Sequence, residues 1–92
     1  MKDKEILTKL NQFDKWNYID GKLVREFICH DFVEALSLTV KIGVLSEKIN
    51  HHPNINLHSW NKVKITIFTH SENGITEKDF QLLELIETKI KL

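Results

Sequence analysis

The stretch from residue 31 to residue 50 constrains the fold more than any other part of this sequence, because it predicts one long helix with two apolar stripes. Asp31 stands three residues before Glu34, which is a capping-box-like start for a helix. At about 100° per residue, the apolar side chains of a helix separate into sets that share a face. One set here is Phe32, Val33, Leu36, Val40 and Val44, and the other is Ala35, Leu38, Ile42, Leu45 and Ile49.

Two apolar stripes on one helix need two surfaces to cover them. One stripe is enough to cover the sheet of the same chain, which has 92 residues. A domain of this size buries a smaller share of its surface than a larger one does, and it gains from an oligomeric interface. We therefore expect the second stripe to form a contact between subunits. The alternative is a helix that is sunk deeply in a single core.

The other elements are predicted from turns, caps and residue alternation. Asp20-Gly21 and Asn73-Gly74 are turn signals, and Thr76 with Asp79 three positions later caps a final helix. The remaining predicted elements are a short helix at 5–10 and strands at 16–19, 22–28, 55–60 and 62–70. We expect one domain over residues 1–92, of the α+β class, with a four-stranded antiparallel sheet, helices packed on one face and the order α-β-β-α-β-β-α.

Charge and composition exclude several classes of protein. Thirteen basic and thirteen acidic residues cancel, and the lysines are scattered, so nucleic acid is not expected as a direct partner. Residues 1–10 lack the apolar run of a signal peptide or a membrane span. Cys29 is the single cysteine, and a chain without an intrachain disulfide suits a reducing compartment. We expect a soluble cytoplasmic protein with no membrane partner.

Histidines gather where the predicted elements end. His51-His52-Pro53 follows the long helix, and proline disfavours helical geometry at the residue before it, so His52 leaves the helix at a fixed place. His70 ends the strand at 62–70. Imidazole suits proton transfer near neutral pH because its unperturbed pKa is about 6.5. The pattern indicates an acid–base site, with Glu47 one helical turn before His51 and Asp79 at the start of the last helix.

Each of these residues also has a plainer interpretation. Tandem histidines at a helix end favour the negative end of the helix dipole. His70 can be an ordinary strand-end residue, and Asp79 is already explained as a capping residue. Glu47 can be a solvated helix carboxylate, and Trp60 can belong to the core.

Two other kinds of site are disfavoured by spacing. A metal site would need several of the four histidines His51, His52, His58 and His70. Neighbouring histidines rarely ligate one ion comfortably, and no helical His-x-x-x-His or thiolate set completes such a site. A nucleophilic Cys29 paired with His30 is disfavoured because adjacent side chains on a strand point to opposite faces.

Taken together, these residues resemble a known family. The spacing is similar to the signature of the pterin-4a-carbinolamine dehydratases at Glu47, His51-His52-Pro53, Trp60, His70 and Asp79. The resemblance covers nearly the whole chain and includes Trp16, Asp20-Gly21, Arg25, Phe27, Asp31-Phe32, Ala35 and Gly74-Ile75-Thr76. The chain departs from the family's usual phenylalanine, alanine, glycine and arginine at Cys29, Ser46, Asn73 and Lys78, respectively.

The resemblance implies a hydro-lyase, a 4a-hydroxytetrahydrobiopterin dehydratase that removes water from 4a-hydroxytetrahydropterin to give quinonoid dihydropterin in tetrahydrobiopterin recycling. It implies that His51 and His70 transfer protons, with His52 mainly binding the pterin. The substrate-binding residues that it implies are Glu47, Pro53, Trp60, Lys78 and Asp79, of which the two carboxylates would orient the imidazoles. It implies no metal, no cofactor, and a homodimer or homotetramer.

Two other functions stay open at this point. Members of the family in animals also act as dimerisation cofactors of a homeodomain transcription factor through their helical surface, so a transcription factor partner is one alternative. The other is a catalytically silent relative that serves molybdopterin metabolism or an unknown pterin, and it would retain the same pocket.

Overall fold

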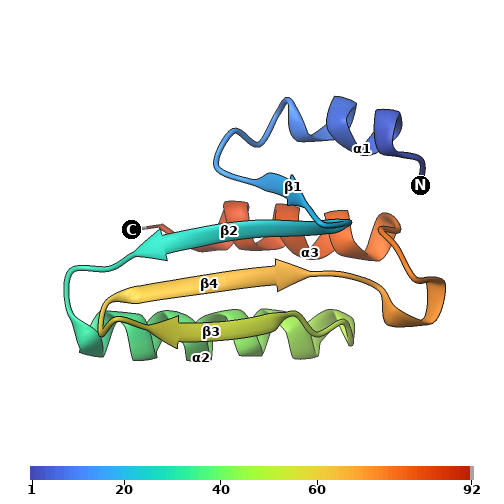
Figure 1. The fold of residues 1–92 in the computed structure, drawn as a ribbon. Helices are drawn as coiled ribbons and strands as arrows, with labels where there is room; N and C mark the ends of the chain where they lie inside the picture. Colours follow the sequence, from blue (N-terminus) through green and yellow to red (C-terminus); the bar gives the residue numbers. More distant parts are fainter. Residues whose placement is uncertain (92) are drawn as a thin grey trace.

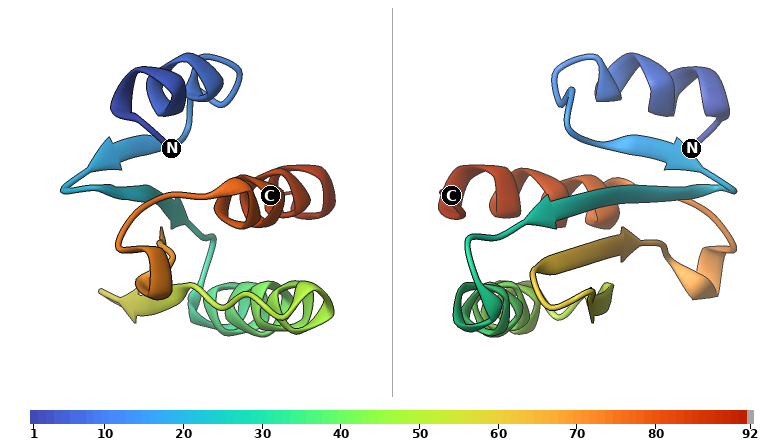
Figure 2. Two further views of the ribbon diagram at one scale, coloured as in Figure 1. Left: turned by 90° about the vertical axis from the view of Figure 1, so that its right-hand side faces the viewer. Right: turned by 60° about the vertical axis from the view of Figure 1, so that its left-hand side comes forward.

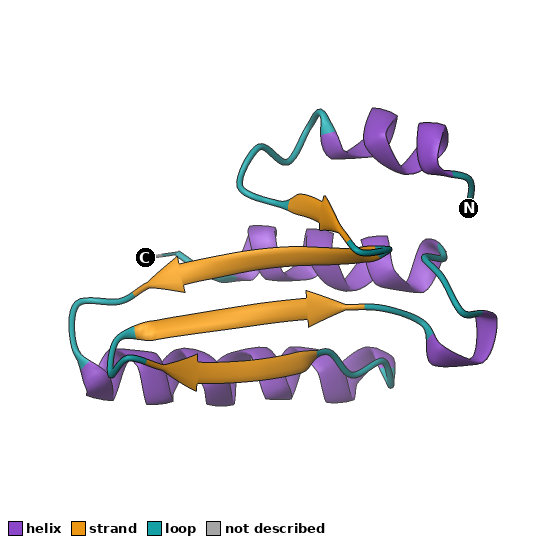
Figure 3. Cartoon of the chain, in the orientation of Figure 1, coloured by secondary structure: helices purple, strands orange, loops and turns teal. Residues whose placement is uncertain are grey.

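The computed structural model of the chain describes residues 1–91 and contains every predicted element. The elements are α1 (Asp3–Leu10), β1 (Asn17–Ile19), β2 (Lys22–Ile28), α2 (Phe32–Ile49), β3 (Asn54–His58), β4 (Lys62–Ile67), the 3-10 helix η1 (His70–Glu72) and α3 (Glu77–Lys89). The four strands form one antiparallel sheet in the order β1-β2-β4-β3 (Figure 3). The predicted α+β class and element order are confirmed.

The helices occupy two positions around the sheet. α2 and α3 lie side by side on one face, while α1 lies beyond β1 at the edge (Figures 1 and 2). The amino group of Met1 donates a hydrogen bond of 2.9 Å to the carbonyl of Ile75, and Lys9 Nζ lies 3.6 Å from the Glu77 carboxylate. These contacts hold α1 against the start of α3. Packing on one face of the sheet therefore describes α2 and α3, and α1 covers the edge.

The core lies between the sheet and the two long helices. Along β4, Val63, Ile65 and Ile67 are fully buried while Lys64 is exposed, which is the alternation of a strand with one covered face. The helices contribute the buried residues Ala35, Leu38, Ile42, Leu45, Phe80, Leu82, Leu83 and Ile86. On the opposite face of the sheet the side chains are mostly polar, because no helix of residues 1–91 covers it.

The two apolar stripes of α2 face different surroundings. The stripe that contains Leu38 and Ile42 is buried against the sheet, with Ile49 at its partly buried end. The other stripe is between 46% and 71% exposed, and it consists of Phe32, Val33, Leu36, Val40 and Val44. No part of the described chain covers this second set, which we call the outer stripe of α2.

Caps and turns follow the chemistry of their residues. Asp31 is the N-cap of α2, and its side chain accepts a hydrogen bond of 2.7 Å from the amide of Glu34. Asp20 and Gly21 both have positive φ, 51° and 75°, as a tight two-residue hairpin turn requires. α1 begins at Asp3, two residues earlier than predicted.

Two strands, β3 and β4, end earlier than predicted. β3 ends at His58 because Ser59 and Trp60 have φ of 50° and 58° and form the turn to β4. β4 ends at Ile67, after which Thr69 forms only an isolated bridge with Gly74 and His70 begins η1. His70 therefore stands at the start of a 3-10 turn and not at the end of a strand.

Within residues 1–91, no helix has both the length and the apolar character needed to cross a membrane.

Candidate active site

The junction between α2 and β3 fixes the direction of the tandem histidines. Asn50, the C-cap of α2, adopts the left-handed conformation with φ of 51°, which turns the chain out of the helix. The amide of His51 then donates to the carbonyl of Ser46 over 3.1 Å. Pro53 precedes the first residue of β3 and restricts His52 to extended geometry. The two imidazoles leave this turn toward different partners.

His51 pairs with a fully buried carboxylate. Its Nε2 lies 2.6 Å from Oδ1 of Asp79, and the two side chains are 12% and 0% exposed. The other oxygen of Asp79, Oδ2, accepts hydrogen bonds from the hydroxyl of Thr69 (2.6 Å) and from the amide of Thr76 (2.8 Å). A buried carboxylate needs such donors to offset the loss of water. Its place in the first turn of α3 also suits the positive end of the helix dipole.

His52 pairs with a different carboxylate on the outside of the molecule. Its Nε2 lies 2.5 Å from Oε1 of Glu47, and the two side chains are 54% and 76% exposed. The pair borders a shallow groove beside the outer stripe of α2, where Val40, Gly43, Val44 and Lys48 lie. An exposed ion pair of this kind contributes little to stability. The structure thus separates His52 and Glu47 from the pair that His51 makes with Asp79.

A cavity of about 540 Å³ opens beside His51. Its lining consists of His51, Thr69, Ser71, Glu72, Thr76, Glu77 and Lys78. A cavity of this size falls within the range of small-molecule sites, and its lining is rich in groups that donate or accept hydrogen bonds. Sequence reasoning did not single out Thr69, Ser71, Glu72 or Glu77 as functional. Their positions beside His70 and Asp79 in the chain were the available signal.

His70 stands at the margin of this cavity. Its neighbours in sequence, Thr69 and Ser71, line the cavity, whereas the His70 ring is exposed and packs edge-to-face on Phe68 with ring centroids 4.9 Å apart. Within residues 1–91, its imidazole forms no ion pair. The structure therefore brings His51 and Lys78 to one cavity, with Asp79 buried and paired with His51, and leaves His70 next to the cavity.

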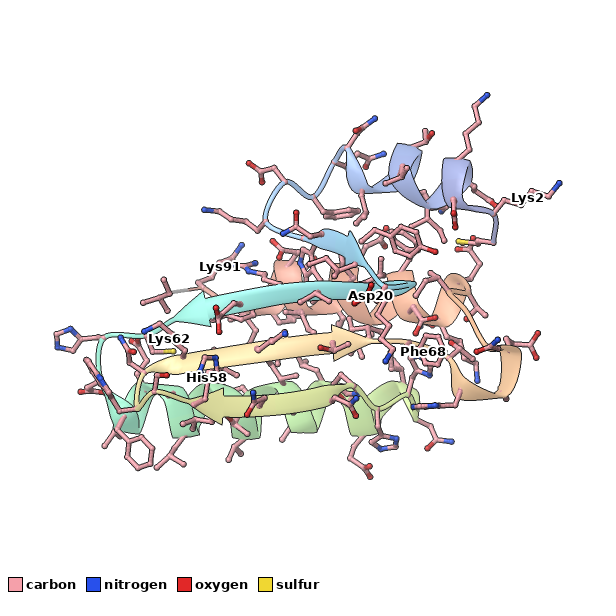
Figure 4. All side chains as sticks on the ribbon, in the orientation of Figure 1. Lys2, Asp20, His58, Lys62, Phe68 and Lys91 are labelled. Atoms are coloured by element: carbon pink, nitrogen blue, oxygen red, sulfur yellow. The ribbon has the colours of Figure 1, made fainter. Side chains whose placement is uncertain are left out.

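Trp60 lies far from this cavity within one chain. It is 62% exposed in the turn between β3 and β4, whereas His51 precedes β3 and His70 follows β4. The two ends of the β3–β4 hairpin are marked in Figure 4 by His58 and Lys62 at the turn and by Phe68 at the other end. A five-residue strand spans about 17 Å at 3.3–3.4 Å per residue. Trp60 therefore cannot form a wall of the His51 cavity of the same chain.

The residues considered for a metal site and for a nucleophilic cysteine have other surroundings in the structure. No group of three or more His, Cys, Asp and Glu side chains that could hold a metal ion occurs in residues 1–91. His58 pairs instead with Glu26 on the open face of the sheet. Cys29 is 4% exposed, and its pKa is raised, first by burial and then by the nearby carboxylates of Glu34 and Asp31. A buried thiol with a raised pKa is a poor nucleophile.

Comparisons with known proteins find the same family along nearly the whole chain. A family model described as Pterin 4 alpha carbinolamine dehydratase matches residues 1–89. Two similar curated proteins carry the name "Putative pterin-4-alpha-carbinolamine dehydratase". One, from Picosynechococcus sp., is 40% identical over 80 residues, which are 87% of this chain and 86% of that protein. The other, from Alkaliphilus metalliredigens, is 49% identical over 78 residues, which are 84% of this chain and 68% of that protein.

A solved structure has the same fold along nearly the whole chain. The crystal structure of a transcriptional coactivator/pterin dehydratase from Brucella melitensis superimposes with a TM-score of 0.86 at 30% sequence identity. The superposition covers 96% of this chain and 95% of that chain.

Proposed function

This chain belongs to the pterin-4a-carbinolamine dehydratase family, and on that premise we propose that it dehydrates 4a-hydroxytetrahydropterin by histidine acid–base catalysis. The reaction breaks the bond between C4a and the hydroxyl oxygen and removes the proton from N5, which gives quinonoid dihydropterin and water. One group must protonate the departing hydroxyl, and another must accept the N5 proton. The step would serve tetrahydrobiopterin recycling, after an aromatic amino acid hydroxylase has formed the carbinolamine.

The observation that carries this proposal is the His51–Asp79 pair beside the cavity. An ionised carboxylate only accepts hydrogen bonds, so Nε2 of His51 holds a proton toward Asp79 and leaves Nδ1 free. Nδ1 can then take the N5 proton, and the buried carboxylate stabilises the imidazolium that forms, as in a catalytic triad. We assign to His51 the role of the base.

His70 is our candidate for the acid that protonates the hydroxyl. Its exposed ring stands beside the cavity and exchanges protons readily with solvent. Lys78 lines the cavity, and its ammonium can hold an oxygen of the pterin ring. His52, Glu47 and Pro53 lie at the adjoining turn, and we propose that they bind the pterin from that side. Trp60 has no place in the proposed site of its own chain.

Turnover by matched histidine variants tests the proposal. We expect the protein to accelerate the formation of quinonoid dihydropterin, followed by ultraviolet absorbance from freshly generated 4a-hydroxytetrahydropterin. His51→Ala and His70→Ala should each lower this acceleration about 10² to 10⁴-fold. His58→Ala is the control, because His58 also pairs with a carboxylate but lies on the open sheet face. Turnover of His51→Ala equal to that of the control would contradict the assignment.

We also propose that the outer stripe of α2 is a contact between subunits in a homodimer or homotetramer. Five large apolar side chains along one helix face are exposed in the single chain, and burying them is favourable at roughly 25 cal/mol per Å². Val40→Glu should reduce the mass measured by light scattering, whereas Lys41→Glu, at an exposed position on the same helix but outside the outer stripe, should leave it unchanged. A wild-type protein that is monomeric at all accessible concentrations would refute this contact.

The same exposed stripe favours one second candidate function, a binding module for a helical partner such as a transcription factor. The related Brucella melitensis protein is described as a transcriptional coactivator/pterin dehydratase. A folded protein that captures such a factor but does not accelerate dehydration would reverse the order of the two candidates. A folded protein that binds a molybdopterin-type pterin but does not accelerate dehydration would point to the alternative in molybdopterin metabolism.

A further inference from the structure

We infer that Thr69 is a positioning residue for the proposed acid–base site, since its hydroxyl orients Asp79 and its backbone fixes the segment that carries His70. The inference rests on the proposed function for its kinetic consequence. Its geometric content, the orientation of Asp79 toward His51, stands independently of the reaction.

The hydroxyl of Thr69 is one of two close donors to Oδ2 of Asp79. The distance from Thr69 Oγ1 to Asp79 Oδ2 is 2.6 Å, and the amide of Thr76 lies 2.8 Å from the same oxygen. A carboxylate is planar, so two donors on Oδ2 fix its rotation and thereby the direction of Oδ1. Oδ1 is the atom that lies 2.6 Å from Nε2 of His51. Thr69 therefore acts on His51 through Asp79.

The backbone of Thr69 closes the loop that carries His70. The amide of Thr69 donates to the carbonyl of Gly74 over 3.0 Å, and the amide of Gly74 returns a bond of 3.3 Å to the carbonyl of Thr69. The amide of Glu72 also donates to the Thr69 carbonyl, over 3.2 Å. The backbone of Thr69 thus holds the loop that carries His70, and the Thr69 side chain connects this loop to Asp79 in α3.

The polarity of this side chain has no explanation in the packing of the sheet. Thr69 is 9% exposed and continues the buried face on which Val63, Ile65 and Ile67 stand. A valine would fill the same space. Within residues 1–91, the hydroxyl has two side-chain partners, Asp79 and, at 3.1 Å, the hydroxyl of Thr76. The geometry therefore assigns the hydroxyl of Thr69 to the hydrogen bonds around Asp79 and Thr76.

The test compares Thr69→Val, which removes the hydroxyl and keeps the branched shape, with Thr69→Ser, which keeps the hydroxyl. Thr66→Val on the open face of the sheet is the matched control. Nitrogen-15 spectra of the His51 ring report which nitrogen carries the proton in the neutral form. We expect a single Nε2–H tautomer in the unmodified protein, in Thr69→Ser and in Thr66→Val, and a mixture of tautomers in Thr69→Val.

The kinetic expectation is a loss in kcat with little change in KM. A small misplacement of a catalytic group can cost up to about 10²-fold in rate, so we expect kcat of Thr69→Val to fall about 10 to 10²-fold. Thr69→Ser should restore it. If Thr69 only stabilised the fold, Thr69→Val would lower the melting temperature. It would not change the tautomer of His51, and it would not lower kcat while leaving KM nearly unchanged.

The outcomes separate this inference from the proposed function. Thr69→Val with the tautomer and kcat of Thr66→Val would overturn the role of Thr69. A changed tautomer in Thr69→Val, in a protein whose unmodified form does not dehydrate the carbinolamine, would support the positioning role and refute the proposed function. If Thr69→Val does not fold, the unmodified protein decides: a hydroxyl held at 2.6 Å should give a slowly exchanging proton signal for Thr69, and its absence would overturn the inference.

Discussion

Replacing Asp79 by asparagine separates the two tasks of this side chain, because asparagine keeps the shape and an acceptor oxygen but loses the charge. The amide oxygen can still face the donors from Thr69 and Thr76, so the amide nitrogen must face His51. That nitrogen only donates, and Nε2 of His51 would have to accept. The proton of the neutral ring would then move to Nδ1, the atom that we propose as the base.

The magnitude follows from the three hydrogen bonds that Asp79 accepts at 2.6–2.8 Å while fully buried. Bonds to charged groups contribute about 1.5–3 kcal/mol and neutral ones about 0.5–1.5, a difference of about 1–1.5 kcal/mol per bond, so over three bonds Asp79→Asn should lower the free energy of unfolding by about 3–4.5 kcal/mol. The dehydration rate should fall as well. In a serine-protease triad, the same change of carboxylate to amide costs about 10⁴ because the histidine adopts the wrong tautomer. We expect a loss of about 10² to 10⁴-fold here.

Asp31→Asn is the matched control for this experiment. Asp31 also caps a helix, as the N-cap of α2, where it accepts a hydrogen bond from the amide of Glu34. Within residues 1–91 its side chain pairs with no histidine. Aspartate and asparagine are nearly equal as N-caps, so this variant should keep both stability and activity. Urea denaturation and the absorbance assay are measured on both variants. Asp79→Asn with turnover within a few-fold of Asp31→Asn would refute the base assignment of His51.

Three further predictions concern the fold and its titratable groups. Leu38→Ala in the buried stripe of α2 should cost about 2–5 kcal/mol in urea denaturation, whereas Leu7→Ala, at a leucine that is 54% exposed, should cost less than about 1 kcal/mol. The hydrogen bond that Tyr18 donates to Asp3, helped by burial, raises the pKa of Tyr18 above its ordinary 10.0. Because the folded pKa is the higher one, its contribution to stability is full below pH 10 and is lost as the pH rises through the folded value. Asp3→Ala removes both the acceptor and its charge, so it should reduce the upward shift of the Tyr18 pKa in an ultraviolet titration. Cys29, with its raised pKa, should react with a thiol reagent at pH 8 much faster in urea than in the folded protein, and equal rates would contradict its burial.

Period-based reasoning predicted the parts of the fold in which burial has a repeat. The alternation along β4 and the two stripes of α2 could be predicted from the sequence, because the face on which a residue lies follows from its position in a regular element. The residues at which β3 and β4 end could not be predicted from such a repeat. Positive φ at Ser59 and Trp60 is uncommon for residues other than glycine, and no local pattern predicted the turn there.

The candidate site was predicted as a set of residues but not as an arrangement. The sequence places His51 and His52 next to each other, and the left-handed Asn50 then directs one ring to buried Asp79 and the other to exposed Glu47. This divergence depends on the backbone of the turn and on the tertiary position of α3, and neither has a sequence period. The same limit applies to Trp60, which shares the motif with the histidines but lies at the opposite end of the hairpin.

Asp79 shows why a capping role and a role beside His51 need not compete. A capping box requires a carboxylate or amide side chain at the third position of the helix, and Asp79 fills that position through Oδ2 alone. Its second oxygen, Oδ1, is left to face His51, which lies in the turn after α2. The helix amide and the Thr69 hydroxyl stabilise the buried charge whether or not a substrate is present. The fold therefore holds the Asp79 carboxylate in a fixed position beside His51, so under the proposed mechanism the imidazolium formed on proton transfer requires no rearrangement of its partner.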